Sequence, residues 1–197
     1  MPTHRTAAMA LAASLTVVIG VAACSSPAQP GIAASSSAIE ANQGGDIPDN
    51  QAFITVKAAS GAFDVQVPEG WAETRRGTSI SFTDKLNSVA LDQSAARAAP
   101  TVQSVASRDV SQLLKSAPNF VLKDVTTFTR AGGSGVRMRY TADSVPDPVT
   151  HKTVQEAVER YLFWSQGRLA VLTLASPDGT DNVDPWAKVS GSFRWLH

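Results

Sequence analysis

The stretch Thr153–Ala175, TVQEAVERYLFWSQGRLAVLTLA, decides the fold class of this 197-residue chain. Its first half, Thr153–Trp164, fits either a helix or a strand, because its apolar residues also recur at helical spacing. The Gln166-Gly167 turn signal and the apolar composition of Leu169–Ala175 favour strands on both sides of the turn. We therefore predict a β-hairpin here, and with it an antiparallel sheet.

Further short strands are expected outside this hairpin. Segments rich in Val, Ile, Thr and Phe are separated by turn signals such as Ser60-Gly61 and Ala131–Gly135. They predict strands at residues 52–58, 62–67, 79–83, 88–92, 120–130 and 136–140. Val145–Thr150 contains two prolines and predicts a loop.

Two helices complete the expected fold. Thr101–Lys115 has apolar residues near helical spacing and lies between two prolines. Asp184-Pro185 predicts a capping carboxylate before a proline in the first turn of a second helix. Trp186, Val189 and Phe193 would share one face of that helix. The element order predicts an α+β fold, a largely antiparallel sheet with a central helix and a C-terminal helix packed on it.

Charge and cysteine content exclude several classes of protein. The chain has 17 Lys and Arg against 17 Asp and Glu, so its formal net charge is zero and its composition gives no support to nucleic acid as a partner. A nearly neutral domain is expected to recognise its partner by shape and apolar contact. The single cysteine excludes an internal disulfide and a cysteine-based zinc site.

Residues 1–23 have the pattern of a secretory signal peptide. The short basic start Met1–Arg5 precedes the apolar run Ala7–Gly20, which is too short to span a bilayer comfortably. The run ends in Val21-Ala22-Ala23-Cys24, which resembles the bacterial lipobox, whose cysteine thiolate takes a diacylglyceryl group. We predict a lipoprotein anchored through Cys24 to the extracytoplasmic face of the cell membrane. The alternative is a plain signal peptide in which Cys24 is an ordinary small residue.

A tether and one domain follow the signal peptide. Residues 24–50 comprise the lipidated cysteine and a segment rich in Ser, Ala, Gly and Pro without aromatic residues. Such a segment buries too little apolar surface to offset its ordering entropy, and as a flexible chain it spans roughly 25 to 30 Å. The composition changes at Gln51, so residues 51–197 are predicted to form a single α+β domain.

Two short motifs resemble a known fold family. Val67-Pro68-Glu69-Gly70-Trp71 follows the opening hairpin, and Ser192-Phe193-Arg194 lies in the closing Trp186–Trp195 segment. With the central helix and the late strands, they resemble the PsbP-like (Mog-type) fold over residues 51–197. With the lipobox and the tether added, the chain resembles the actinobacterial (mycobacterial) LpqN-type lipoproteins. The resemblance implies a non-enzymatic binding or assembly function and supplies no catalytic residues.

Few side chains suit nucleophilic catalysis. His151 is the one histidine between the signal peptide and the C-terminal residue. Gly132-Gly133-Ser134-Gly135 comes nearest to a nucleophile elbow, but it lies in a predicted turn and lacks the helix that should follow. A hydrolase using Ser134 and His151 is therefore a weaker interpretation than turn glycines and a loop histidine.

Metal sites are not expected either. Two groups of titratable side chains recur at regular spacing: Asp178, Asp181 and Asp184, and Asp143, Asp147 and His151. The first group does not match the ligand spacing of an EF-hand, and its members suit a turn and a helix cap. Two prolines prevent the second group from aligning on a helix. We expect no metal and no cofactor.

Tryptophans and arginine pairs are the remaining candidates for contact with a partner. Trp71 and Trp186 are expected in the core. Trp164 and Trp195, near a strand end and the chain terminus, are the candidates for contact with a partner, a glycan or an acyl chain, with a core position as the alternative. Two basic pairs are expected on a solvated rim: Arg75-Arg76 and Arg137/Arg139.

Three functions remain open from the sequence. The leading one is a membrane-anchored, extracytoplasmic, non-catalytic module of the bacterial cell envelope that binds another envelope protein, a lipid or a glycan. The second is a carrier of an apolar envelope ligand, such as a lipid or acyl chain, held between helix and sheet. The third is the hydrolase using Ser134 and His151.

Overall fold

The hairpin that decides the fold class is confirmed by the computed structural model, which describes residues 44–196. β8 (Gln155–Ser165) pairs antiparallel with β9 (Arg168–Pro177). Gln166 and Gly167 between them both have positive φ, 47° and 80°, as a tight two-residue hairpin turn requires. Turn chemistry therefore decides against the helical periodicity of residues 153–164.

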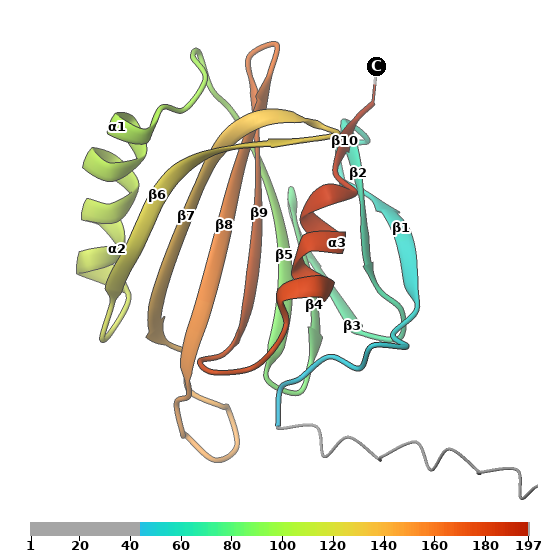
Figure 1. Cartoon of the computed structure of the whole chain (residues 1–197), viewed down its shortest axis with the longest axis vertical. Coiled ribbons are helices and arrows are strands. Elements are labelled where there is room, and N and C mark those ends of the chain that lie inside the picture. Colours follow the sequence, from blue (N-terminus) through green and yellow to red (C-terminus); the bar gives the residue numbers. More distant parts are fainter. Residues whose placement is uncertain (1–43, 197) are drawn as a thin grey trace, which may run out of the picture. The chain divides into compact units, whose positions relative to one another are not determined.

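These two strands lie in the middle of a seven-stranded antiparallel sheet, of order β3-β4-β5-β9-β8-β7-β6 (Figure 1). A smaller sheet has the order β1-β2-β10. The other strands are β1 (Phe53–Lys57), β2 (Phe63–Pro68), β3 (Ala72–Arg76), β4 (Ser79–Asp84), β5 (Asn87–Ala95), β6 (Val121–Arg130), β7 (Gly133–Asp143) and β10 (Arg194–Trp195). The predicted α+β fold with a largely antiparallel sheet is confirmed.

The predicted central helix is present and covers one face of the large sheet. It starts with a capping box, in which the Thr101 hydroxyl accepts from the Ser104 N–H and the Ser104 hydroxyl accepts from the Thr101 N–H. Val105 and Val110 pack against a buried cluster that includes Met138 of β7. The helix comprises α1 (Val102–Ser104), a π-helical turn η1 (Val105–Asp109) and α2 (Val110–Ser116).

Helix α3 (Val183–Gly191) and the small sheet pack on the opposite face. Successive side chains of a strand point to opposite faces, and in β8 Leu162 belongs to the cluster under the central helix. Its neighbour Phe163 belongs to the cluster under α3, where its ring stacks on Phe193 with centroids 3.9 Å apart. The two helical segments thus share one sheet between two separate cores.

The ends of α3 differ from the prediction. Its N-cap is Asn182, while Asp184 lies in the first turn and is not the cap. The Asn182 side chain does not bond to the helix, because it accepts from the Ile47 N–H at 2.8 Å and donates to the Gly45 carbonyl at 2.9 Å. Phe193 lies beyond the end of α3, so its ring reaches the core from the segment leading into β10.

Two further differences concern strands. β3 has the sequence AETRR, and all five residues are exposed. The sequence therefore shows no alternation of apolar and polar residues that would predict a strand there. The turn predicted at Ala131–Gly135 is shorter, because β7 already begins at Gly133 and includes Ser134. Gly135 permits this close pairing, since a Cβ atom there would lie 2.2 Å from the Leu162 carbonyl oxygen.

Residues 44–50, which the sequence assigns to the tether, pack on the domain. Ile47 is 5% exposed and belongs to the core under α3. The Asp46 carboxylate accepts from the Asp181 N–H at 3.1 Å. The signal peptide, Cys24 and the first part of the tether lie outside the described residues. Within residues 44–196, no helix has the length and apolar character needed to cross a bilayer.

Candidate binding site

The candidate site starts from the alternation of side chains along β7. Val136, Met138 and Tyr140 are buried under the central helix. Arg137 and Arg139 therefore point to the other face, towards α3. The sequence predicts a solvated rim for these two arginines. In the structure Arg139 is exposed and Arg137 is half-buried, and both line a cleft between the large sheet and α3.

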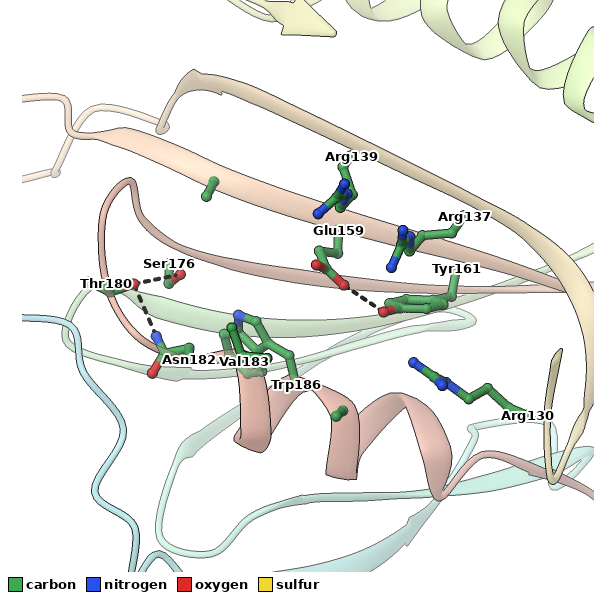
Figure 2. Close-up of a pocket in the computed structure, with 12 residues that line it drawn as sticks. Arg130, Arg137, Arg139, Glu159, Tyr161, Ser176, Thr180, Asn182, Val183 and Trp186 are labelled. Atoms are coloured by element: carbon green, nitrogen blue, oxygen red, sulfur yellow. Dashed lines mark hydrogen bonds between the residues drawn. The ribbon is translucent and has the colours of Figure 1, made fainter. Parts of the chain in front are cut away.

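The register of the sheet completes the polar wall of this cleft. Across the β7–β8 ladder, Arg137 is opposite Tyr161 and Arg139 is opposite Glu159. Arg130, the last residue of β6, reaches in from the end of the sheet (Figure 2). The resulting space of about 280 Å³ is called the arginine cleft, and its characteristic residues are Arg130, Arg137, Arg139, Glu159, Tyr161 and, from α3, Trp186.

The charges of the arginine cleft are only partly paired. Arg139 donates from Nε to Asp124 Oδ2 of β6 at 2.8 Å, and this hydrogen bond raises the pKa of Arg139. Arg137 lies 3.9 Å from the other oxygen of the same carboxylate. Arg130 forms no ion pair with any residue in the 44–196 range. Three guanidinium groups thus face two carboxylates, Asp124 and Glu159, which leaves one net positive charge.

Several buried polar atoms at this site lack a hydrogen bond. Among the described residues, the Nε atoms of Arg130 and Arg137 and the Oδ1 atom of Asp124 are buried and have no hydrogen-bond partner. A buried donor without a partner costs roughly 1 to 3 kcal/mol, and more when it is charged. Native proteins keep few such groups, and a bound ligand is one way to satisfy them.

Tyr161 is the neutral donor of the site. It is 2% exposed, and its hydroxyl donates to Glu159 Oε2 at 2.5 Å. Burial and the neighbouring carboxylate raise the pKa of Tyr161, so the phenol stays protonated at physiological pH. The hydrogen bond also holds Glu159 against the wall, where it does not pair with Arg130.

This arrangement suits binding of an anionic group. A guanidinium pairs with carboxylate or phosphate oxygens through two parallel hydrogen bonds, and the half-buried position strengthens the interaction. Trp186 is 6% exposed and supplies an apolar wall opposite the arginines. The cleft can therefore hold a small acidic group of a partner molecule.

The two tryptophans singled out from the sequence lie on opposite faces of the large sheet. Trp164 is two residues after Leu162 in β8, so its side chain lies on the same face of the sheet, under the central helix. Its Nε1 donates to the Ala96 carbonyl at 2.9 Å. Trp195 packs edge-on against Phe63 and lies beneath the guanidinium of Arg168, 5.5 Å from the ring centroid. Both are half-buried and neither lines the arginine cleft.

Ser134 and His151 do not form a catalytic pair. Ser134 is the second residue of β7 and lies 3.1 Å from the Thr129 hydroxyl. His151 lies in the loop after Asp143, at the opposite end of the same strand (Figure 1). Nine residues of strand at about 3.3 Å each place the two ends roughly 30 Å apart. This separation excludes the hydrolase interpretation based on Ser134 and His151.

Asp143 and Asp147 form local hydrogen bonds. The Asp147 carboxylate accepts from the N–H groups of Val149 and Thr150, and these bonds lower the pKa of Asp147. Asp143 accepts from the Asn119 side chain at 2.7 Å. In the part of the chain that the structure describes, no group of three or more His, Cys, Asp or Glu side chains is placed to hold a metal ion.

Sequence reasoning missed Arg130, Glu159 and Tyr161 as members of a site. Their signal was present in the alternation of β7 and β8, which places each second residue on one face once the register is known. The contribution of Trp186 was not readable in this way, because α3 reaches the cleft from a segment that follows β9 in the chain.

The α+β architecture of the domain is similar to the PsbP-like fold, as a solved structure shows. No protein-family model and no curated protein sequence matches the chain. The solution structure of cyanobacterial PsbP (CyanoP) from Synechocystis sp. PCC 6803 matches with a TM-score of 0.55 at 14% identity, over 77% of this chain and 98% of that chain. At this identity the likeness shows the fold alone.

Two other solved structures match less closely. The Ran-binding protein Mog1p of Saccharomyces cerevisiae has a TM-score of 0.47 at 11% identity, over 73% of this chain and 95% of its own. LpqN of Mycobacterium tuberculosis, described as involved in cell envelope biogenesis, has a TM-score of 0.43 at 15% identity, over 76% of this chain and 93% of its own. Neither likeness carries a functional argument here.

Proposed function

We propose that the protein is a lipoprotein of the bacterial cell envelope that binds an anionic group on an envelope partner and has no catalytic activity. In this proposal Cys24 carries the diacylglyceryl anchor, the following residues act as a tether, and the domain lies on the extracytoplasmic side of the membrane. The support for the anchor is the pattern Val21-Ala22-Ala23-Cys24 at the end of a short apolar run.

The observation that carries the binding function is the incomplete pairing of the arginine cleft. Within residues 44–196, the buried Nε atoms of Arg130 and Arg137 have no hydrogen-bond partner. An acidic side chain of a protein, a uronic acid or a phosphate would each supply the missing acceptors. Trp195, half-buried at the end of the chain, remains a candidate for an additional partner contact.

The anchor is tested by the Cys24→Ala variant. Wild-type protein should enter the detergent phase on Triton X-114 partitioning and should incorporate a clickable fatty acid in growing cells, because two or more acyl chains give stable anchoring. Cys24→Ala should lose both properties, whereas the neighbouring Ser25→Ala variant should keep them. Equal partitioning of Cys24→Ala and wild type would refute the anchor.

The binding function is tested by charge removal in the cleft. Arg130→Gln and Arg137→Gln keep a polar side chain but remove the cation, and Arg75→Gln on the exposed strand β3 is the matched control. After chemical crosslinking in cells, the two cleft variants should recover the partner of the wild type in about tenfold lower yield, as expected for one lost charged hydrogen bond. Recovery equal to that of Arg75→Gln would overturn the assignment of the cleft.

A further inference from the structure

A second groove lies on the other face of the large sheet, under the start of the central helix. Strands β8 and β9 form its floor, the residues 104–109 of α1 and η1 form one side, and the loop after β5 forms the other. Its volume is about 560 Å³. We call it the alanine groove, because it is lined by Ala95 at the end of β5 and by Ala96, Ala98, Ala99 and Pro100 of the following loop, around one arginine, Arg97.

The alanine groove carries unpaired positive charge. It is lined by Arg97, Arg108 and Arg160, and Asp109 is its one carboxylate. Arg108 donates to Asp109 at 3.1 and 3.3 Å, so that pair is neutral. Neither Arg97 nor Arg160 forms an ion pair with another residue of the described chain, and the buried Nε of Arg160 has no hydrogen-bond partner there.

Apolar surface lies next to this charge. Leu169 and Val171 of β9 form part of the floor, and the alanines of the loop line the same groove. Small side chains on the loop leave room that larger ones would fill. The groove thus combines cationic and aliphatic side chains, which is the complement of a molecule with an acidic head and a short hydrocarbon chain.

Two features hold the groove in shape. Trp164 Nε1 donates to the Ala96 carbonyl at 2.9 Å, and the Ala96 N–H donates to the Gly167 carbonyl at 2.8 Å. These bonds fasten the loop to the β8–β9 hairpin. On the other side, the π-helical turn Val105–Asp109 places Arg108 and Asp109 at the groove, and such turns occur frequently at functional sites.

We propose that the alanine groove binds a small amphiphile with a single anionic head, a carboxylate or a phosphate monoester. The head pairs with Arg160 and Arg97, and the aliphatic chain lies along the alanine loop, Leu169 and Val171. This inference does not depend on the arginine cleft, which lies on the opposite face. It is a more specific form of the carrier function that the sequence left open, in which the ligand between helix and sheet has a charged head.

The test measures equilibrium binding of three eight-carbon probes to the full chain in phosphatidylcholine nanodiscs, with empty nanodiscs subtracted. The probes are octanoate, octyl phosphate and octanol. We expect at least one of the two anionic probes to bind at the alanine groove, and octanol to bind at least tenfold more weakly. Binding of octanol equal to that of both anionic probes would overturn the proposal.

Variants locate the site. Arg160→Gln should weaken binding of the anionic probe about tenfold or more, since one charged hydrogen-bond pair is lost. Ala98→Trp, at an exposed position of the loop, should block the groove and give the same loss. Arg75→Gln, on the exposed strand β3 and outside both the groove and the arginine cleft, is the matched control and should bind as the wild type does. Unchanged binding in Ala98→Trp, or an equal loss in Arg75→Gln, would refute the assignment.

Discussion

Replacement of Phe193 by alanine should remove a large part of the stability of the domain. The Phe193 ring is fully buried between Phe163, at 3.9 Å between centroids, Phe63, at 5.0 Å, and Trp195, at 5.3 Å. Truncation to alanine leaves a space of about 100 Å³, which costs about 2.4 kcal/mol at 24 cal/mol per Å³, and the lost transfer free energy adds about 2 kcal/mol. We expect a loss of about 4 to 5 kcal/mol, which is within the range measured for such changes.

The measurement is urea unfolding of the full chain, followed by tryptophan fluorescence. With a slope of about 2 kcal/mol per M, the midpoint should fall by about 2 M at an unchanged slope. Phe193→Leu should lose less than half as much, because the leucine fills most of the space. Leu86→Ala, at a side chain that is 44% exposed, should stay within about 0.5 kcal/mol. A midpoint shift below about 0.5 M for Phe193→Ala would show that the aromatic cluster does not hold the C-terminal segment.

Three further changes test other parts of the structure. Gly135→Ala should destabilise by about 3 kcal/mol, because its Cβ would lie 2.2 Å from the Leu162 carbonyl oxygen, whereas Gly191→Ala meets nothing within 4 Å and should be neutral; equal melting temperatures for the two variants would contradict this. Asn182→Ala should cost about 1 to 3 kcal/mol and speed amide exchange at Ile47, whose N–H it binds; unchanged exchange in NMR would count against that role. Burial raises the pKa of Glu156 above its unfolded value, so its ionisation weakens the fold as the pH rises through that range. Glu156→Gln should therefore be slightly more stable than the wild type at pH 7 and equal to it at pH 3; the opposite ranking in a thermal melt at pH 7 would disprove the sign.

The elements that the sequence predicts well are those determined by local chemistry. Gln166-Gly167 specifies a tight turn whatever its surroundings, and the hairpin of β8 and β9 follows from it. The central helix is likewise bounded in the sequence, by Pro100 before it and Pro118 after it. Strand β3 could not be predicted in this way, because its five exposed residues AETRR show no alternation of apolar and polar side chains. Its extended conformation depends on pairing with β4.

Tertiary contacts explain the misplaced helix cap. Asp184 before Pro185 has the local chemistry of an N-cap, and yet the helix begins earlier. The Asn182 side chain forms hydrogen bonds with the Ile47 N–H and the Gly45 carbonyl, and no local sequence pattern predicts these contacts. The same contacts bring residues 44–50 onto the domain. Composition alone assigns those residues to the tether, because it contains no information about a distant partner for their backbone.

Although the net charge is zero, the structure contains two sites with an excess of positive charge. The reason is that acidic and basic side chains occupy different kinds of position in the fold. Aspartates favour turns and helix starts, where short side chains bond to nearby N–H groups, as Asp147 does. Arginines have long aliphatic stems that pack along strands, so Arg137 and Arg160 can occupy half-buried sheet positions. The two signs are therefore separated in space even though they cancel in number. Alternation then divides the arginines between the two faces of the sheet: the side chains of Glu159 and Arg160, neighbours in β8, belong to different sites. A charge count averages over both faces, and only the register of the sheet resolves them.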